Sequence, residues 1–172
     1  LCLWFDLGQP YRKKELKSLQ QTKIPFKTIN LNLIRDEFNN IPTTDFPNHI
    51  IPGRNLIMAT IAASFGERIW LIALDTEMHK FAKERDKSGK FYNDTTNLLT
   101  YIFNIKREKT IIETPFKNMT KTEVVKWALD NGLTKDYLKK TSTCYDKNIN
   151  CGKCSTCFKR WIAFINNNIT EK

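Results

Sequence analysis

The fold is decided by the ten residues LCLWFDLGQP at Leu1–Pro10. Their five consecutive apolar residues predict a short strand that is covered on both faces, as in a parallel sheet with helices packed on it. A polar turn follows at Asp6–Gln9, and Pro10 is typical of the first turn of a helix. The stretch therefore predicts a strand, a tight turn and a helix, which is the repeating unit of a parallel α/β fold.

Strands and helices continue to alternate along the rest of the chain. Strands are expected at residues 26–31, 69–74 and 110–113, and helices at 11–21, 56–68, 98–103, 121–130 and 158–165, while 75–93 is expected to be charged and irregular. This order predicts a Rossmann-like parallel sheet with helices on both faces and a C-terminal four-cysteine segment. We expect an N-terminally incomplete sheet domain at 1–140 and a zinc-binding segment with the terminal helix at 141–172.

Length and composition exclude several classes of protein. The chain has 172 residues, of which 41% are hydrophobic and 27% charged, so disorder, collagen and disulfide-dense miniproteins are excluded. No apolar run is long enough to span a bilayer and no signal peptide is evident, which predicts a cytoplasmic protein without a membrane partner. The net charge is +10, but there are 21 lysines against only 7 arginines, and the lysines are scattered, so nucleic acid is not an expected partner.

Four cysteines near the C-terminus form the pattern C-x6-C-x2-C-x2-C at Cys144, Cys151, Cys154 and Cys157. Four thiolates at this spacing favour a structural Zn²⁺ site, with Gly152 allowing the chain to bend between two ligands. An iron–sulfur cluster, disulfides and a redox C-x2-C pair remain open as alternatives. The fifth cysteine, Cys2, lies in the first strand and is expected to be a small apolar residue.

Several blocks, in this order along the chain, resemble the 7-cyano-7-deazaguanine synthase family. They are FDLGQ at Phe5–Gln9, IPGRN at Ile51–Asn55, Thr114–Pro115 with the capping-box pattern Thr120–Glu123, and Thr143–Tyr145 with the three later cysteines. The proline-glycine-arginine-asparagine block together with the cysteine pattern is the specific part of this resemblance. It extends over almost the whole chain, from residue 1 to about residue 165.

The resemblance implies an ATP-dependent carbon–nitrogen ligase of the queuosine pathway, with a Rossmann-like sheet like that of other ATP pyrophosphatases. The implied substrates are 7-carboxy-7-deazaguanine, ammonia and ATP with Mg²⁺. The implied reaction adenylates the carboxylate, replaces AMP with ammonia, and adenylates the resulting amide to leave the nitrile. The resemblance also allows a homodimer. The alternative is a non-catalytic, zinc-containing remnant of the family that binds a partner or nucleic acid.

The chain departs from the family pattern at three places. It holds no Ser-Gly-Gly-x-Asp-Ser loop, which in this family cradles pyrophosphate, since no two of its six glycines are adjacent. We therefore expect the chain to begin after that loop and to be inactive without it. Residues 86–94 replace the family's tyrosine-proline-aspartate-cysteine-arginine stretch, and Leu7 stands where a tyrosine is usual.

The resemblance assigns roles to individual residues. Asp6, Gly8, Gln9 and Arg54 are expected to contact the nucleotide, and Arg54, Asp75 and Asp86 the substrate. The competing interpretations are a turn and helix start for the first three residues, a surface cation for Arg54, and a cap or solvated loop residues for the two aspartates. No catalytic residue is assigned, and neither His49 nor His79 has a partner at ligand spacing.

Overall fold

A computed structural model describes residues 1–31, 53–75, 85–104, 109–145 and 150–171. The chain divides into two compact units, of which unit 1 contains Leu1–Ile50 and Lys121–Lys172, and unit 2 contains Ile51–Thr120. The boundary predicted after residue 140 lies inside unit 1 and stays a prediction. Within the described residues, no helix has both the length and the apolar character needed to cross a membrane.

Unit 1 begins with the strand, turn and helix that the first ten residues predict. Strand β1 (Cys2–Asp6) is followed by helix α1 (Arg12–Gln21) and strand β2 (Phe26–Asn30). The two strands pair in parallel, with Cys2 opposite Phe26 and Asp6 opposite Asn30. A parallel pair joined by a helix is the expected α/β unit, so this prediction is confirmed.

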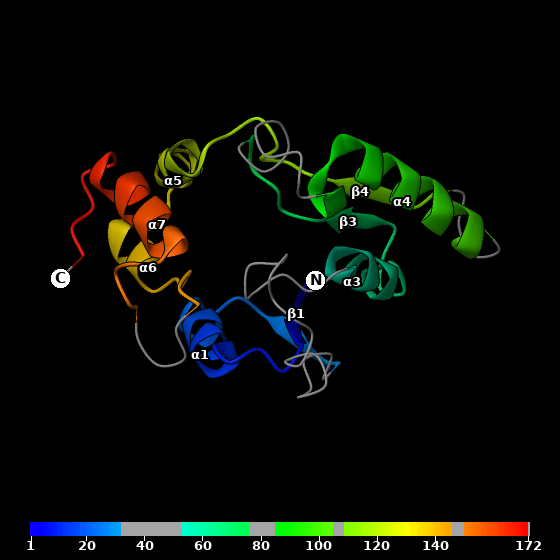
Figure 1. Cartoon of the computed structure of the whole chain (residues 1–172), viewed down its shortest axis with the longest axis horizontal. Helices are drawn as coiled ribbons and strands as arrows, with labels where there is room; N and C mark the ends of the chain where they lie inside the picture. Colours follow the sequence, from blue (N-terminus) through cyan, green and yellow to red (C-terminus); the bar gives the residue numbers. More distant parts are fainter. Residues whose placement is uncertain (32–52, 76–84, 105–108, 146–149, 172) are drawn as a thin grey trace, which may run out of the picture. The chain divides into compact units, whose positions relative to one another are not determined.

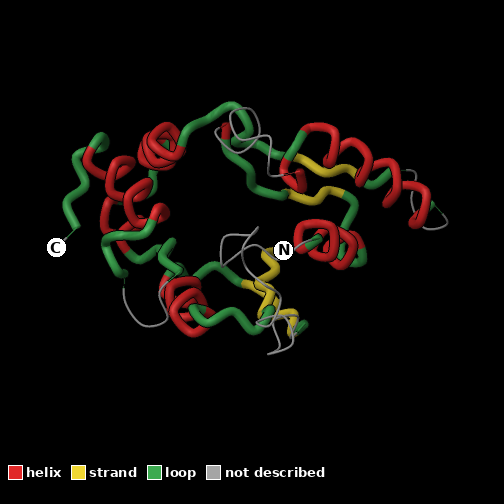
Figure 2. Tube along the Cα trace, in the orientation of Figure 1, coloured by secondary structure: helices red, strands yellow, loops and turns green. Residues whose placement is uncertain are grey.

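The part of unit 1 from Lys121 onward contains three helices among its described residues. They are α5 (Lys121–Asp130), α6 (Lys135–Lys139) and α7 (Ser155–Ile165) (Figures 1 and 2). They share an apolar core whose members are Val125, Ala128, Leu138, Ala163, Phe164 and Ile169. Helix α5 begins directly after Thr120, as the capping-box pattern predicts.

The end of α5 has the geometry expected from its asparagine-glycine pair. Gly132 has a left-handed φ of 89°, which glycine adopts without a steric cost. Because of this turn, the backbone N–H of Leu133 reaches the carbonyl of Ala128 at 2.9 Å and satisfies an acceptor at the helix end. The side chain of Thr134 then accepts a hydrogen bond from the Tyr137 N–H and starts α6.

Unit 2 contains helix α3 (Arg54–Ala63), strand β3 (Arg68–Trp70), the 3-10 turn η2 (Arg85–Lys87), helix α4 (Gly89–Phe103) and strand β4 (Ile111–Glu113). The two strands pair in parallel, with Ile69 opposite Ile112. The buried core of this unit consists of Ala59, Ala63, Ile69, Ala73, Tyr92, Leu99 and Ile112. Both units thus combine parallel strands with helices, which confirms the α/β class (Figure 2).

Three predicted boundaries in unit 2 are wrong. Helix α3 ends at Ala63 instead of residue 68, and β3 ends at Trp70 instead of residue 74. The expectation of irregular structure up to residue 93 is also wrong, because α4 begins at Gly89. The physical reason is Ser88, whose side chain accepts a hydrogen bond from the Phe91 N–H at 3.1 Å and caps the helix. Residues 51 and 52 of the IPGRN block, His49 and His79 lie outside the described residues.

Substitution of Ser88 by alanine is expected to lower the free energy of unfolding by about 1 kcal/mol, because the first turn of α4 loses its side-chain acceptor. Urea denaturation of the two proteins measures the difference. Threonine at this position keeps the oxygen, so Ser88→Thr should retain most of the stability. Equal losses in both variants would contradict the capping role.

Candidate metal centre and ligand-binding residues

The four C-terminal cysteines bring their sulfurs together at one point of unit 1. The Sγ atoms of Cys144, Cys151, Cys154 and Cys157 all lie within 4.8 Å of one another. Cys144 is separated from Cys151 by 3.6 Å and from Cys154 by 4.0 Å, and Cys151 is 4.0 Å from Cys157. In a tetrahedral four-thiolate site with bonds of about 2.3 Å, neighbouring sulfurs are about 3.8 Å apart. The cluster therefore has the dimensions needed to hold one metal ion.

Local backbone structure aims these sulfurs. Gly152 has a left-handed φ of 70°, so the chain turns sharply between Cys151 and Cys154. The backbone N–H of Cys151 donates to the sulfur of Cys144 at 3.3 Å. Cys154 is the N-cap of α7, and its sulfur accepts the N–H of Cys157 at 3.4 Å. Cys144 and Cys151 are thus joined by a backbone hydrogen bond, and Cys154 and Cys157 are oriented by the first turn of α7.

The proton affinities of the thiols differ strongly across the cluster. Burial acts to raise the pKa of Cys154, but hydrogen bonds from Thr156 and from the Cys157 N–H outweigh it and lower the pKa to about 5. Burial, reinforced by the neighbouring Cys144 and Cys154, raises the pKa of Cys157 to about 12. Several thiolates this close together repel one another, so full ionisation of the set needs a bound cation.

The disulfide alternative is wrong for this structure. All five cysteines are free thiols, Cys2 included. The sulfurs of the cluster are separated by 3.6 Å or more, well above the bond length of about 2 Å in a disulfide. Cys2 is half-buried in β1, apart from the cluster, which agrees with the apolar role predicted for it.

A buried arginine, which the sequence analysis did not single out, connects α7 to the segment that leads to the cysteines. Arg160 is 4% exposed, and its Nε lies 3.0 Å from both carboxylate oxygens of Glu171. Its Nη1 donates to the Thr141 hydroxyl at 2.7 Å, and its Nη2 donates to the Leu138 carbonyl at 3.2 Å. The guanidinium also lies 4.1 Å from the centroid of the Phe164 ring. The residues just before Cys144 are therefore held by α7 itself.

The turn after β1 is held largely by its own side chains. Asp6 accepts the N–H of Gly8 at 2.9 Å, and Gly8 has a left-handed φ of 84°. Gln9 is buried, with its carbonyl oxygen accepting the Leu7 N–H at 2.8 Å. Its amide nitrogen donates to the carbonyl of Phe5 and to the carboxylate of Glu15. Both amide hydrogens of Gln9 are thus used, one on β1 and one on α1, and only its carbonyl oxygen has capacity left for a ligand.

The other predicted ligand-binding residues belong to unit 2. Arg54 is the first residue of α3 and is half-buried, and its guanidinium group has no hydrogen-bond or ion-pair partner among the described residues. The neighbouring Asn55 donates to the backbone carbonyl of Asp86 at 3.1 Å, so the start of α3 is tied to η2. Asp75 follows β3, is half-buried, and donates its backbone N–H to the Met119 carbonyl at 3.1 Å. Arg54 and Asp86 are thereby brought into one region of unit 2.

Comparisons with known proteins give a consistent result. The family described as queuosine biosynthesis protein QueC matches residues 10–168. A 7-cyano-7-deazaguanine synthase of Prochlorococcus marinus (strain AS9601) is 32% identical, covering 96% of this chain and 84% of that protein. A protein of the same name from strain MIT 9312 is 30% identical, covering 93% of this chain and 82% of its own length. The equally named protein of Rickettsia massiliae (strain Mtu5) is 32% identical over 74% of this chain, which spans 58% of that relative.

Proposed function

Because the chain belongs to the queuosine biosynthesis protein QueC family, we propose that it is a 7-cyano-7-deazaguanine synthase that acts on 7-carboxy-7-deazaguanine with ATP and ammonia. The observation that carries this proposal is the family match over residues 10–168, supported by the name shared by the related proteins. The gathered cysteines of the specific tail motif agree with it.

The proposed reaction uses ATP to activate first a carboxylate and then an amide. A carboxylate is a poor electrophile, so its oxygen attacks the α-phosphate of ATP, pyrophosphate leaves, and an acyl-adenylate forms. Ammonia then attacks the carbonyl carbon, AMP leaves, and the nitrogen loses a proton to give the amide. A second ATP adenylates the amide oxygen, and loss of AMP and two protons leaves the nitrile. Each nitrile formed is therefore accompanied by two AMP and two pyrophosphate molecules.

We assign Zn²⁺ to the four-cysteine cluster, as a structural ion held by Cys144, Cys151, Cys154 and Cys157. The sulfurs all lie within 4.8 Å of one another, three of the pairs at 3.6–4.0 Å, which supports one tetrahedral ion and leaves too little space for a cluster of several irons. All four protein ligands are sulfurs, which is typical of a structural site without an open position. When bound, the ion supplies charge neutralisation and cross-links the segment before α7 to the start of that helix.

In unit 1 we assign the turn after β1 to the nucleotide. Asp6 and Gly8 lie at the carboxyl end of a parallel strand, where α/β proteins bind their ligands. Gln9 is a positioning residue in this proposal, since its amide fixes the backbone of the turn. Arg12 supplies a positive charge beside this turn, because its Nε lies 3.8 Å from the Asp6 carboxylate.

In unit 2 we assign Arg54, Asp75 and Asp86 to the deazaguanine acid. A half-buried guanidinium without a partner among the described residues suits the negative charge of a carboxylate, and the N-terminal end of α3 favours an anion. The two aspartates can accept hydrogen bonds from the N–H groups of a purine-like ring. The contact between Asn55 and the Asp86 carbonyl supports a common location for Arg54 and Asp86.

The activity is tested with the chain extended at its N-terminus by a strand and a Ser-Gly-Gly-x-Asp-Ser loop, and loaded with zinc. Incubation with ATP, Mg²⁺, ammonium and 7-carboxy-7-deazaguanine should yield AMP and a product with the mass of the nitrile, with two AMP per product. The chain without the extension serves as the matched control and should form no AMP. If the folded, extended protein forms no AMP in response to the acid, the synthase proposal is wrong and the non-catalytic alternative replaces it.

In the same assay, Arg54→Ala is expected to lower kcat/KM for the acid by about a hundredfold, because a charge-assisted bidentate contact is worth roughly 1.5–3 kcal/mol. Arg54→Lys should recover only part of this loss, since a lysine keeps the charge but not the planar fork. Arg68→Ala is the control, because Arg68 is an exposed residue of β3 that pairs with Glu113. An unchanged kcat/KM in Arg54→Ala would remove Arg54 from the substrate site.

A further inference from the structure

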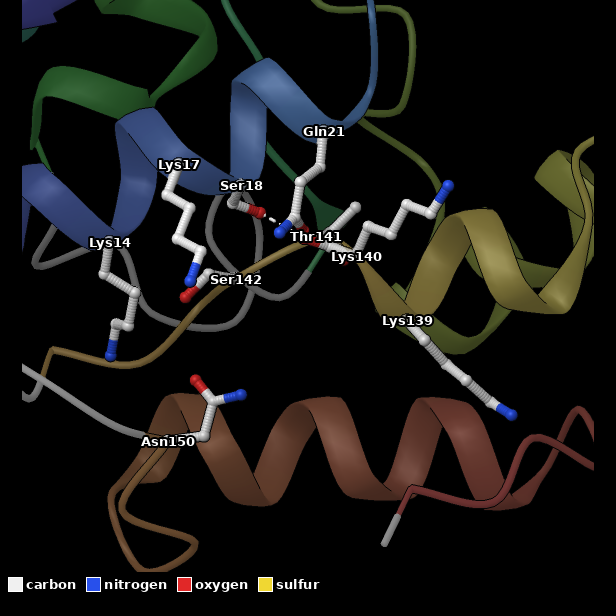
Figure 3. A pocket seen from close by; sticks show the side chains of 9 residues that line it. All are labelled: Lys14, Lys17, Ser18, Gln21, Lys139, Lys140, Thr141, Ser142 and Asn150. Atoms are coloured by element: carbon white, nitrogen blue, oxygen red, sulfur yellow. Dashed lines mark hydrogen bonds between the residues drawn. The ribbon is translucent and has the colours of Figure 1, made fainter.

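Unit 1 contains a basic pocket that the proposed function does not use. It is a cavity of about 210 Å³ between α1 and the segment that leaves α6 (Figure 3). Four lysines, three hydroxyl residues and two amide residues line it: Lys14, Lys17, Lys139, Lys140, Ser18, Thr141, Ser142, Gln21 and Asn150. We call this set the lysine pocket. No acidic side chain belongs to the lining, although the ammonium group of Lys139 is paired with the Asp136 carboxylate at 3.6 Å.

The walls of the lysine pocket are fixed by hydrogen bonds between distant parts of the sequence. The hydroxyl of Ser18 on α1 donates to the backbone carbonyl of Lys140, which joins the two sides. The Thr141 hydroxyl accepts from Arg160 at 2.7 Å, so the floor of the pocket is held by the buried arginine of α7. The backbone that forms the floor is therefore already in place before a ligand binds.

The donors of the lysine pocket suit a tetrahedral oxyanion. Lys14 and Lys17 extend from α1 toward the side where Ser142 and Asn150 lie, while the side chains of Lys139 and Lys140 point away from that side (Figure 3). The Ser142 hydroxyl oxygen is buried and has no hydrogen-bond partner among the described residues. A buried hydroxyl without a partner is costly unless a ligand satisfies it. Ammonium, hydroxyl and amide groups together form the set that binds a phosphate group through charge and several hydrogen bonds.

We propose that the lysine pocket is a binding site for phosphate groups carrying two or more negative charges. The proposal is independent of the synthase activity, because it uses neither the cysteines nor the residues assigned to substrate and nucleotide. Its lysines act as point charges without the planar fork of arginine, so the pocket recognises charge and not base sequence. The phosphate can come from a small diphosphate or from a nucleic-acid backbone, and the experiment separates these two sources.

Two probes are titrated against the zinc-loaded chain by calorimetry, inorganic pyrophosphate and a ten-nucleotide single-stranded RNA. The test variants are Lys14→Gln/Lys17→Gln, which removes two charges, and Ser142→Ala, which removes the unpartnered hydroxyl without changing the charge. The matched control is Lys117→Gln/Lys159→Gln, which removes two charges from exposed positions outside the pocket. Circular dichroism and thermal melting of each variant verify that it is folded.

Both test variants should weaken the binding of at least one probe by about tenfold or more, and the control should change it less than twofold. Pyrophosphate binding identifies a small diphosphate as a sufficient ligand. RNA binding without pyrophosphate binding identifies a nucleic-acid backbone as the source of the phosphate. The slope of log K against log salt concentration for RNA should then be smaller in magnitude by about 1.4 in Lys14→Gln/Lys17→Gln. The proposal is overturned if neither probe binds, if the control weakens binding as much as the test variants, or if Ser142→Ala has no effect.

Discussion

Replacing Cys144 with serine is expected to abolish stoichiometric metal binding and to lower the free energy of unfolding by more than about 4 kcal/mol. Losses of this size occur when a structural metal is removed. Cys144 is 3% exposed, and its sulfur lies within 4.0 Å of those of Cys151 and Cys154. A serine hydroxyl does not ionise at neutral pH, so the remaining thiolates would repel one another without a fourth ligand to hold the cation.

Elemental analysis and thermal melting test this expectation on the purified proteins. The matched control is Cys2→Ser, because Cys2 is also a free thiol but lies in β1. The control should keep one zinc per chain, and a chelator should lower its melting temperature. The chelator should have little further effect on Cys144→Ser. One zinc per chain in Cys144→Ser would show that the four sulfurs do not form the metal site.

Replacing Arg160 with alanine is expected to cost about 3–5 kcal/mol, because it leaves Glu171 without its partner and uncovers polar groups inside unit 1. The guanidinium uses its Nε and both terminal nitrogens on the Glu171 carboxylate, the Thr141 hydroxyl and the Leu138 carbonyl. It also covers the Phe164 ring.

Urea denaturation measures this loss of stability, and two further variants test whether it comes from the guanidinium group of Arg160. Lys159→Ala changes the neighbouring exposed residue and should stay within about 0.5 kcal/mol of the parent. Arg160→Lys keeps the charge but cannot reach the carboxylate and the carbonyl together, so most of the loss should remain. A loss below about 1 kcal/mol in Arg160→Ala would contradict the central role given to this residue.

The fold was predictable where apolar residues lie in a short run or at helical spacing. Cys2–Asp6 forms the expected strand, and its parallel pairing with β2 follows from the helix between them. The start of α4 was missed because it lies in a stretch rich in charged residues, where Lys90 and Asp94 form an ion pair one helical turn apart. Such a helix start depends on a cap and on charge pairing, which hydrophobic periodicity does not detect.

The candidate metal site was predictable because its ligands are close in sequence and chemically distinctive. The role of Arg160 was not, since its partners at Thr141 and Glu171 are separated from it by 19 and 11 residues. One signal was available: Arg160 lies between the buried Cys157 and Phe164 at helical spacing, so a charge on that face needs a partner. The lysine pocket depends on α1 meeting a segment more than a hundred residues later, which no local pattern encodes.

Unit 1 combines the first residues of the chain with residues from Lys121 onward. During synthesis on the ribosome, β1 and α1 therefore emerge long before α5, α6 and α7, while unit 2 is continuous and can fold first. The N-terminal part must therefore wait for its contacts with the later residues, which include the Ser18–Lys140 hydrogen bond and the Tyr11–Tyr145 ring pair, and partly folded states of this kind are prone to aggregation. Slower expression at low temperature, with co-produced chaperones, should accordingly increase the yield of native protein more than changes made after purification.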